Sequence, residues 1–146
     1  MTQHHFHLRA NWPGKRNDFG EIQSGNLSTQ VSIPKEMDGP GIGTNPDEML
    51  LGAAATCYII TLAALLERSG ISQEGLELES TAIVDVTNGI FTYEKIIHRP
   101  TIVLIDGKDM IKTQRLVIKA EETCMISKAL RGNVVIELEA NISSIK

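Results

Sequence analysis

The chain has 146 residues, about the length of one domain, and its 42% hydrophobic and 22% charged residues are ordinary for a soluble globular protein. The formal net charge is −4, and no run of basic residues is longer than two, whereas binding a phosphate backbone requires clustered Lys and Arg. We therefore expect a single domain over residues 1–146 that does not bind nucleic acid.

The N-terminal sequence has no apolar run and no small-residue cleavage site, so it does not resemble a signal peptide. The longest apolar stretch, residues 49–66, is short and polar for a membrane span of about 20 residues. These features predict a cytoplasmic protein with no membrane partner. In a reducing compartment, two cysteines more often serve transient, catalytic or redox-sensing chemistry than a structural disulfide.

Residues 6–34 are rich in Gly, Asn and Ser, with short strand-like segments at 6–12, 20–24 and 27–33. This pattern is typical of short antiparallel strands joined by tight turns. The next segment, 37–43, contains three glycines and one proline, and it predicts a loop.

A long helix is predicted to begin at Asn45, a favourable N-cap that is followed by Pro46 at the first helical position and by Glu48 as in a capping box. Gly70 stands where a left-handed residue ends a helix. The segment between them is apolar on every side, which is typical of a buried helix. In so small a chain, this pattern suggests that a second subunit supplies part of the cover.

The remainder predicts a hairpin, a second helix and a final strand. Residues 76–86 alternate with period two, Asn88-Gly89 is a strong hairpin signal, and the returning strand over 90–98 is expected to be interrupted at Pro100 before 101–105 resumes it. Asp109 is expected to cap a helix that ends near Cys124, followed by a short helical turn over 128–131 and a last strand over 134–142. The order of elements predicts an α+β fold.

The two cysteines lie in the segments GTNPDEMLLGAAATC (43–57) and AEETCMISKAL (120–130). A zinc site would need about four ligands, and His4, His5 and His7 are far from both thiols in sequence, so we expect no metal and no cofactor. Two possibilities remain open. Cys57 and Cys124 are inert buried thiols, or they form a redox pair in which one thiolate is oxidised to a sulfenic acid and the other thiol condenses with it.

Both segments resemble the cysteine motifs of the OsmC/Ohr family of hydroperoxide reductases, in order as well as in spacing; Met125 replaces the usual proline of the second motif. The resemblance implies an antioxidant enzyme with an OsmC-like fold, a thiol-dependent peroxidase that reduces organic hydroperoxides. It implies that Cys57 is peroxidatic, that Cys124 resolves it through a redox-active disulfide, and that a dithiol returns the electrons. It also implies an intertwined homodimer. We expect an apolar pocket at Cys57, lined by residues such as Met49, Leu50, Tyr58 and Met125.

Family members also use an acid after the Asn-Pro pair and an arginine from the loop before the helix. Asp47 occupies the acid position, with Glu48 beside it, although both residues equally suit plain helix capping. Asp47 is about 15 Å from Cys57 on a straight helix, so it can act only through an intervening cation or if the helix bends, most cheaply at Gly52.

The arginine position is a departure from the family pattern. Met37 or a neighbour takes its place, Lys35 is the nearest cation, and Arg9 or Arg16 could reach from the N-terminal strands. A lysine lacks the bidentate fork of an arginine. The alternative function is therefore a redox-sensing or apolar-ligand-binding dimer with weak or no peroxidase turnover.

Overall fold

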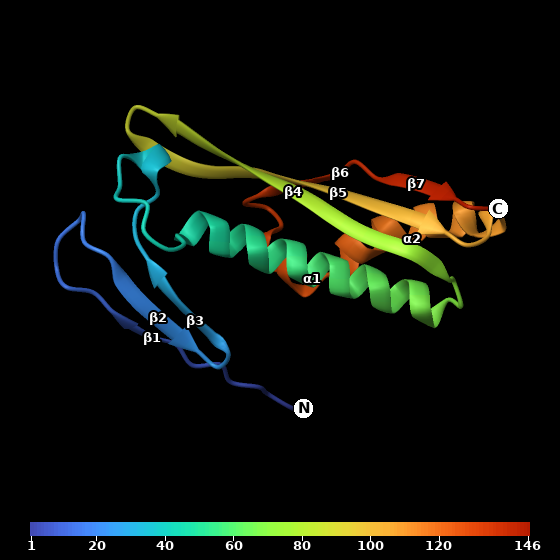
Figure 1. Cartoon of the computed structure of the whole chain (residues 1–146), viewed down its shortest axis with the longest axis horizontal. Helices are drawn as coiled ribbons and strands as arrows, with labels where there is room; N and C mark the ends of the chain where they lie inside the picture. Colours follow the sequence, from blue (N-terminus) through green and yellow to red (C-terminus); the bar gives the residue numbers. More distant parts are fainter. The chain divides into compact units, whose positions relative to one another are not determined.

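The computed structural model describes residues 1–146 and divides the chain into two compact units, Met1–Met49 and Leu50–Lys146. Each unit has its own β-sheet (Figure 1), and the α+β class is confirmed. In chain order the elements are β1 (Arg9–Asn11), β2 (Gly20–Ser24), β3 (Leu27–Val31), the 3₁₀ turn η1 (Lys35–Met37), α1 (Pro46–Arg68), β4 (Gln73–Thr87), β5 (Ile90–Leu104), the 3₁₀ turn η2 (Gly107–Asp109), α2 (Met110–Thr123), α3 (Met125–Leu130), β6 (Val135–Leu138) and β7 (Asn141–Ser144).

The first unit is a three-stranded antiparallel sheet in the order β1-β2-β3, followed by the predicted loop. Hydrogen bonds fix this loop against β3. The Ser32 hydroxyl donates to the carbonyl of Ile42 at 2.8 Å and accepts from its amide at 2.7 Å, and the Thr44 amide donates to the Gln30 carbonyl at 2.9 Å.

Both ends of α1 lie where the sequence predicts them. The Asn45 side chain accepts a hydrogen bond from the Glu48 amide at 2.9 Å, which satisfies one of the free N–H groups of the first turn. At the other end Gly70 has φ 68°, and the Ile71 amide donates back to the Leu66 carbonyl at 3.0 Å.

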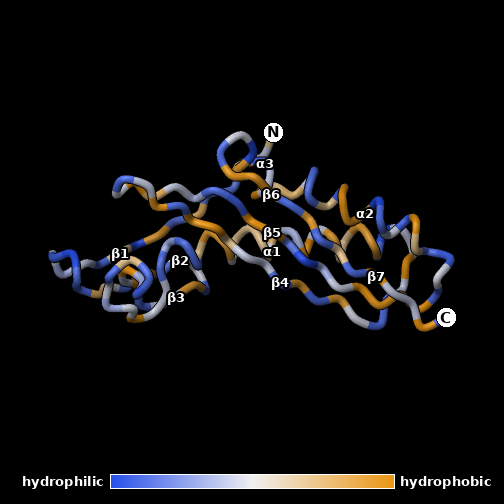
Figure 2. Tube along the Cα trace, turned by 90° about the horizontal axis from the view of Figure 1, so that it is seen from above, coloured by the Kyte–Doolittle hydropathy of each residue, from blue (hydrophilic) through white to orange (hydrophobic).

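The second unit is built on the hairpin of β4 and β5, whose turn at Asn88 and Gly89 has φ angles of 53° and 75°, as this type of turn requires. Strands β6 and β7 both pair with β5 in parallel. Figure 2 shows hydrophobic and hydrophilic residues following one another along β4 and β5. Helices α1 and α2 pack on one face of this sheet, and their core is formed by Tyr58, Leu62, Leu66, Ile71, Ile102, Leu104, Leu116, Val117 and Ala120.

Three expectations for the second unit are wrong. Strand β5 runs without interruption through Pro100, which faces Leu78 in the hairpin. On the other edge of β5, β6 ends opposite His98 and β7 begins opposite Thr101. Neither strand therefore pairs with β5 at the proline, where a backbone N–H is missing. The predicted last strand is two strands, because the chain leaves the sheet between β6 and β7. Asp109 makes no side-chain cap; Asp106 instead accepts from the Lys108 amide at 2.9 Å.

The sequence predicts that α1 is buried on every side, but its own chain buries only one face of it. Only Ala54, Tyr58, Leu62 and Leu66 are buried, while Ile60 on the opposite face is 64% exposed. By length and composition α1 could also cross a membrane, which the shorter apolar stretch in the sequence did not suggest. The central helix of a soluble protein meets the same criterion, so the criterion does not separate the two classes.

Candidate active site

Cys57 and Cys124 lie side by side in the second unit, in side-chain hydrogen-bond contact. Cys57 is half-buried on α1, whereas Cys124 is fully buried at the junction of α2 and α3. The Cys124 amide donates to the Ala120 carbonyl at 2.9 Å, and the Cys124 carbonyl accepts from the Lys128 amide at 2.9 Å, so both helices hold this residue. Neither thiol is in a disulfide.

The surroundings of Cys57 favour its thiolate. Partial burial raises the pKa of Cys57, but hydrogen bonds from the Cys124 thiol and from the Ile126 amide outweigh this effect, and the Thr61 hydroxyl and the Met125 amide add to them, so the pKa lies below its ordinary value. These donors are neutral groups, and two of them are the first amides of α3. A nucleophilic sulfur is thus available at lower pH than in a free cysteine.

Cys124 has the opposite tendency. Burial raises the pKa of Cys124, and its hydrogen bond to Cys57 raises it further, while the thiol and amide contacts with Ser127 oppose this effect. The pair therefore holds one proton preferentially on Cys124, which donates it toward the sulfur of Cys57. This is the arrangement that an attacking thiolate and a resolving thiol require.

A buried polar cluster lies beside the thiols. Tyr58, the residue after Cys57, donates a hydrogen bond from its hydroxyl to the Val117 carbonyl of α2 at 2.9 Å, and its ring stacks on His98 with 4.9 Å between the ring centroids. Burial raises the pKa of Tyr58, and the nearby charges of Glu121 and Cys124 raise it further. Tyr58, which we expected to line an apolar pocket at Cys57, is completely buried and faces no solvent-accessible pocket.

The other predicted site residues belong to the first unit or to the start of α1. Lys35 lies in η1 with its alkyl chain beside Gly41, Asp47 lies in the first turn of α1, and Glu48 accepts a hydrogen bond from the Thr44 hydroxyl at 2.8 Å. Helix α1 is continuous through Gly52, so it does not break there. Any role of Lys35, Asp47 or Glu48 in thiol chemistry stays a prediction.

Arg16 of the first unit reaches the loop segment in which the sequence lacks the expected arginine. The Arg16 guanidinium donates to the carbonyl of Met37 at 3.0 Å and to that of Asp38 at 3.3 Å. The family resemblance led us to expect an arginine at Met37 or a neighbouring position. The sequence suggested Arg16 only as one of two candidates, because nothing in it connects residue 16 with residue 37.

Sequence reasoning missed two residues that contact Cys57, Thr61 and Ile126, and a third, His98, that stacks on the neighbouring Tyr58. Thr61 could have been found, because it is one helical turn after Cys57, and its hydroxyl lies beside that residue, 2.7 Å from the Cys57 carbonyl oxygen. Ile126 acts through its backbone amide, which leaves no signal in the side chain. His98 gives no signal either, since its role depends on the pairing of β4 with β5.

Comparison with known proteins identifies relatives over most of the chain. The family model described as OsmC-like protein matches residues 39–139. An uncharacterized protein of Bacillus subtilis, YmaD, is 63% identical and covers 97% of each chain, and an organic hydroperoxide resistance protein of Xanthomonas axonopodis is 28% identical over 77% of this chain and 78% of its own. Among solved structures, an organic hydroperoxide resistance protein OsmC of Legionella pneumophila is similar with 26% identity and a TM-score of 0.79, covering 97% of this chain and 99% of its own.

Proposed function

Because the chain belongs to the OsmC-like protein family, whose members include proteins named for organic hydroperoxide resistance, we propose that it is a thiol-dependent peroxidase for organic hydroperoxides. The observation that carries this proposal is the contact between Cys57, whose pKa is lowered, and Cys124, whose pKa is raised.

The proposed reaction has three steps. The Cys57 thiolate attacks the outer peroxide oxygen, the O–O bond breaks, and the alkoxide leaves as an alcohol after taking a proton; the sulfur becomes a sulfenic acid. The Cys124 sulfur then attacks that of Cys57, and the Cys124 proton leaves with the displaced hydroxyl as water. A dithiol finally reduces the disulfide and becomes a disulfide itself.

Two basic residues are candidates for the cation that would orient the peroxide. Lys35 is nearest in sequence to the expected position, and the Arg16 guanidinium is held at the carbonyls of Met37 and Asp38. An arginine offers the planar fork that pairs with two oxygen acceptors, which favours Arg16. Asp47 or Glu48 would orient this cation rather than contact the sulfur.

The exposed apolar residues of α1 support a homodimer in solution. Ile60 is 64% exposed, and Ala53 and Ala63 are exposed with it on a helix face that its own chain does not cover. We expect sedimentation equilibrium to give twice the mass of the chain, and Ile60→Lys to shift the protein toward the monomer.

A cytoplasmic location, in which both thiols stay reduced, fits the proposed peroxidase function.

The proposal is tested by stopped-flow oxidation of the reduced protein with cumene hydroperoxide, beside the variants Cys57→Ser and Cys124→Ser. We expect fast oxidation that requires Cys57, with Cys124→Ser stopping at a sulfenic acid that dimedone traps. Lys35→Met and Arg16→Met then separate the two cations, and Lys15→Met, next to Arg16 in the chain, is the matched control. Oxidation of the unmodified protein no faster than that of free cysteine would contradict the peroxidase and support the redox-sensing or ligand-binding alternative.

A further inference from the structure

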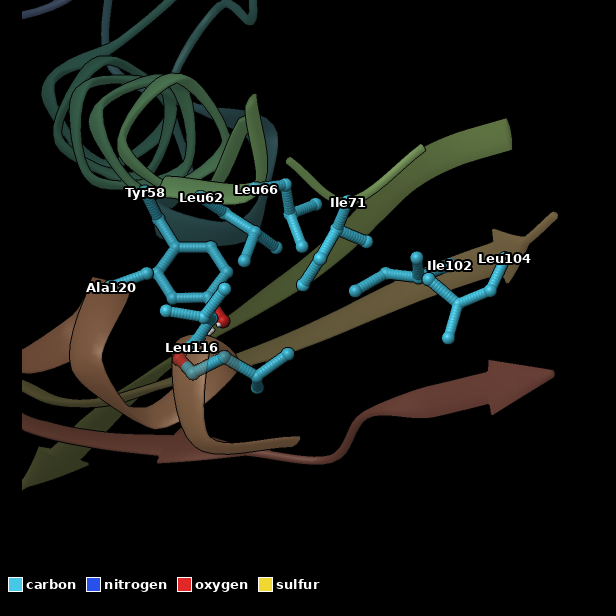
Figure 3. Close-up of a cluster of buried hydrophobic side chains, with 9 residues drawn as sticks. Tyr58, Leu62, Leu66, Ile71, Ile102, Leu104, Leu116 and Ala120 are labelled. Carbon is cyan, nitrogen blue, oxygen red and sulfur yellow. Dashed lines mark hydrogen bonds between the residues drawn. The ribbon is translucent and has the colours of Figure 1, made fainter. Parts of the chain in front are cut away.

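The side chain of Tyr58 connects the helices that carry the two thiols. Its hydroxyl is bound to the Val117 carbonyl of α2, and its ring is fully buried between α1 and α2, as Figure 3 shows for Tyr58 beside Leu116 and Ala120. Cys57 precedes Tyr58 on α1, and Cys124 follows Val117 by two helical turns, about 10 Å, directly after the end of α2. A hydrogen bond at this point fixes how far α1 can slide along α2.

The other side of the Tyr58 ring is fixed by the sheet. His98 lies on the inward-facing row of β5 and is completely buried, and its ring stacks on that of Tyr58 at an interplanar angle of 15°. The Nδ1 atom of His98 lies 2.6 Å from the hydroxyl of Ser80 on β4, which sets the orientation of the imidazole. Stacked rings and buried hydrogen bonds both restrict motion more than aliphatic contacts do.

We propose that Tyr58, His98 and Ser80 form a clamp that holds Cys57 and Cys124 together for disulfide closure. These three are positioning residues, since none of them takes part in the covalent steps. The inference rests on the Cys57–Cys124 disulfide of the proposed function, but not on the identity of the oxidant. Two thiols already held in contact lose little freedom when they join, so a pair in the clamp closes at a higher effective concentration than a loose pair.

The clamp acts on disulfide closure more than on the attack on peroxide. Of the groups that stabilise the Cys57 thiolate, only the Cys124 thiol depends on the clamp, whereas the amides of α3 and the Thr61 side chain remain in place when the clamp is loosened. Tyr58→Phe and Ser80→Ala should therefore slow the closure of the disulfide about fivefold or more each. The rate of sulfenic acid formation, measured at a pH at which Cys57 is ionised in every variant, should stay within a factor of two. A purely structural role would not separate these two rates.

The direct test is the equilibrium between the protein thiols and glutathione redox buffers, which needs no peroxide. We expect the effective concentration of the thiol pair to fall about fivefold in Tyr58→Phe. In the double variant, Ser80→Ala should lower the effective concentration by a smaller further factor than it does alone, because both substitutions act through the position of the Tyr58 ring. Leu66→Val is the matched control. This buried α1 residue lies two turns beyond Tyr58, and its shortening lowers stability without removing a polar contact.

The outcomes separate the clamp from the proposed function. If Leu66→Val lowers the effective concentration as much as Tyr58→Phe, or if the unmodified protein forms no disulfide in oxidised glutathione, the clamp is overturned. If the glutathione equilibrium shifts only in the clamp variants while cumene hydroperoxide fails to oxidise Cys57, the clamp stands and the peroxidase proposal fails.

Discussion

The thiol of Cys124 donates a hydrogen bond to the sulfur of Cys57, and this single contact shifts the two pKa values in opposite directions. The proton that the pair shares belongs to the more deeply buried partner. The less buried sulfur, that of Cys57 on α1, is thereby prepared to react, and the Cys124 thiol lies in contact with it.

Replacing Cys124 by Ala should raise the pKa of Cys57, because its largest stabilising hydrogen bond is lost while the partial burial stays. Cys124→Ser keeps a donor at the same place and should raise the pKa less. The measurement is the rate of iodoacetamide alkylation of Cys57 as a function of pH. Profiles for both variants that equal the profile of the parent protein would show that Cys124 does not stabilise the Cys57 thiolate.

Stability should fall at acid pH because of His98. Burial lowers the pKa of His98 in the folded protein, opposed by the Glu121 charge, whereas in the unfolded chain its pKa is about 6.5. Between these two values the unfolded state binds a proton that the folded state does not, so stability decreases as the pH falls below about 6.5. Above that pH, His98 is neutral in both states and its contribution to the free energy of unfolding no longer changes.

This pH dependence is tested by urea unfolding from pH 7.5 to pH 5. His98→Phe keeps a ring over Tyr58 but cannot titrate, so its unfolding free energy should change less with pH over the same range. If the unfolding free energy of His98→Phe changes with pH as steeply as that of the parent protein, other groups cause the acid sensitivity.

Thr113 offers a stabilising substitution. Its side chain is completely buried on α2, and its hydroxyl has no hydrogen-bond partner in the protein. Thr113→Val keeps the shape and removes the cost of burying that hydroxyl, so the free energy of unfolding should rise by about 1 kcal/mol. Urea denaturation measures the change, with Thr123→Val on the exposed end of the same helix as the control; a clear loss of stability would contradict the expectation.

Asn45→Ala should lower the free energy of unfolding by about 1 kcal/mol, since the Glu48 amide loses its acceptor at the start of α1. Asn45→Asp retains an acceptor and should lose much less. Thermal unfolding followed by circular dichroism compares the two variants. No difference between Ala and Asp at this position would mean that Pro46 and the helix packing set the start of α1 without the cap.

Several features of the fold could be predicted because they depend on neighbouring residues. Asn45 and Pro46 start α1, Gly70 ends it, and Asn88-Gly89 closes the hairpin, each through a backbone preference that acts within a few residues. Pro100 was misjudged by the same kind of rule. A proline weakens a strand only where its missing N–H would be paired, and that depends on where β6 and β7 end.

The amino-acid sequence by itself determined the α+β order of elements and the two cysteine motifs that identify the family. Only the tertiary structure decided that Cys57 contacts Cys124, that Tyr58 and His98 stack beside them, and that Arg16 reaches the carbonyl of Met37. The physical reason is range. Capping, turns and periodicity are local interactions that a short segment expresses, whereas the pKa of a thiol and the packing of a ring depend on groups that distant parts of the chain bring to the same place.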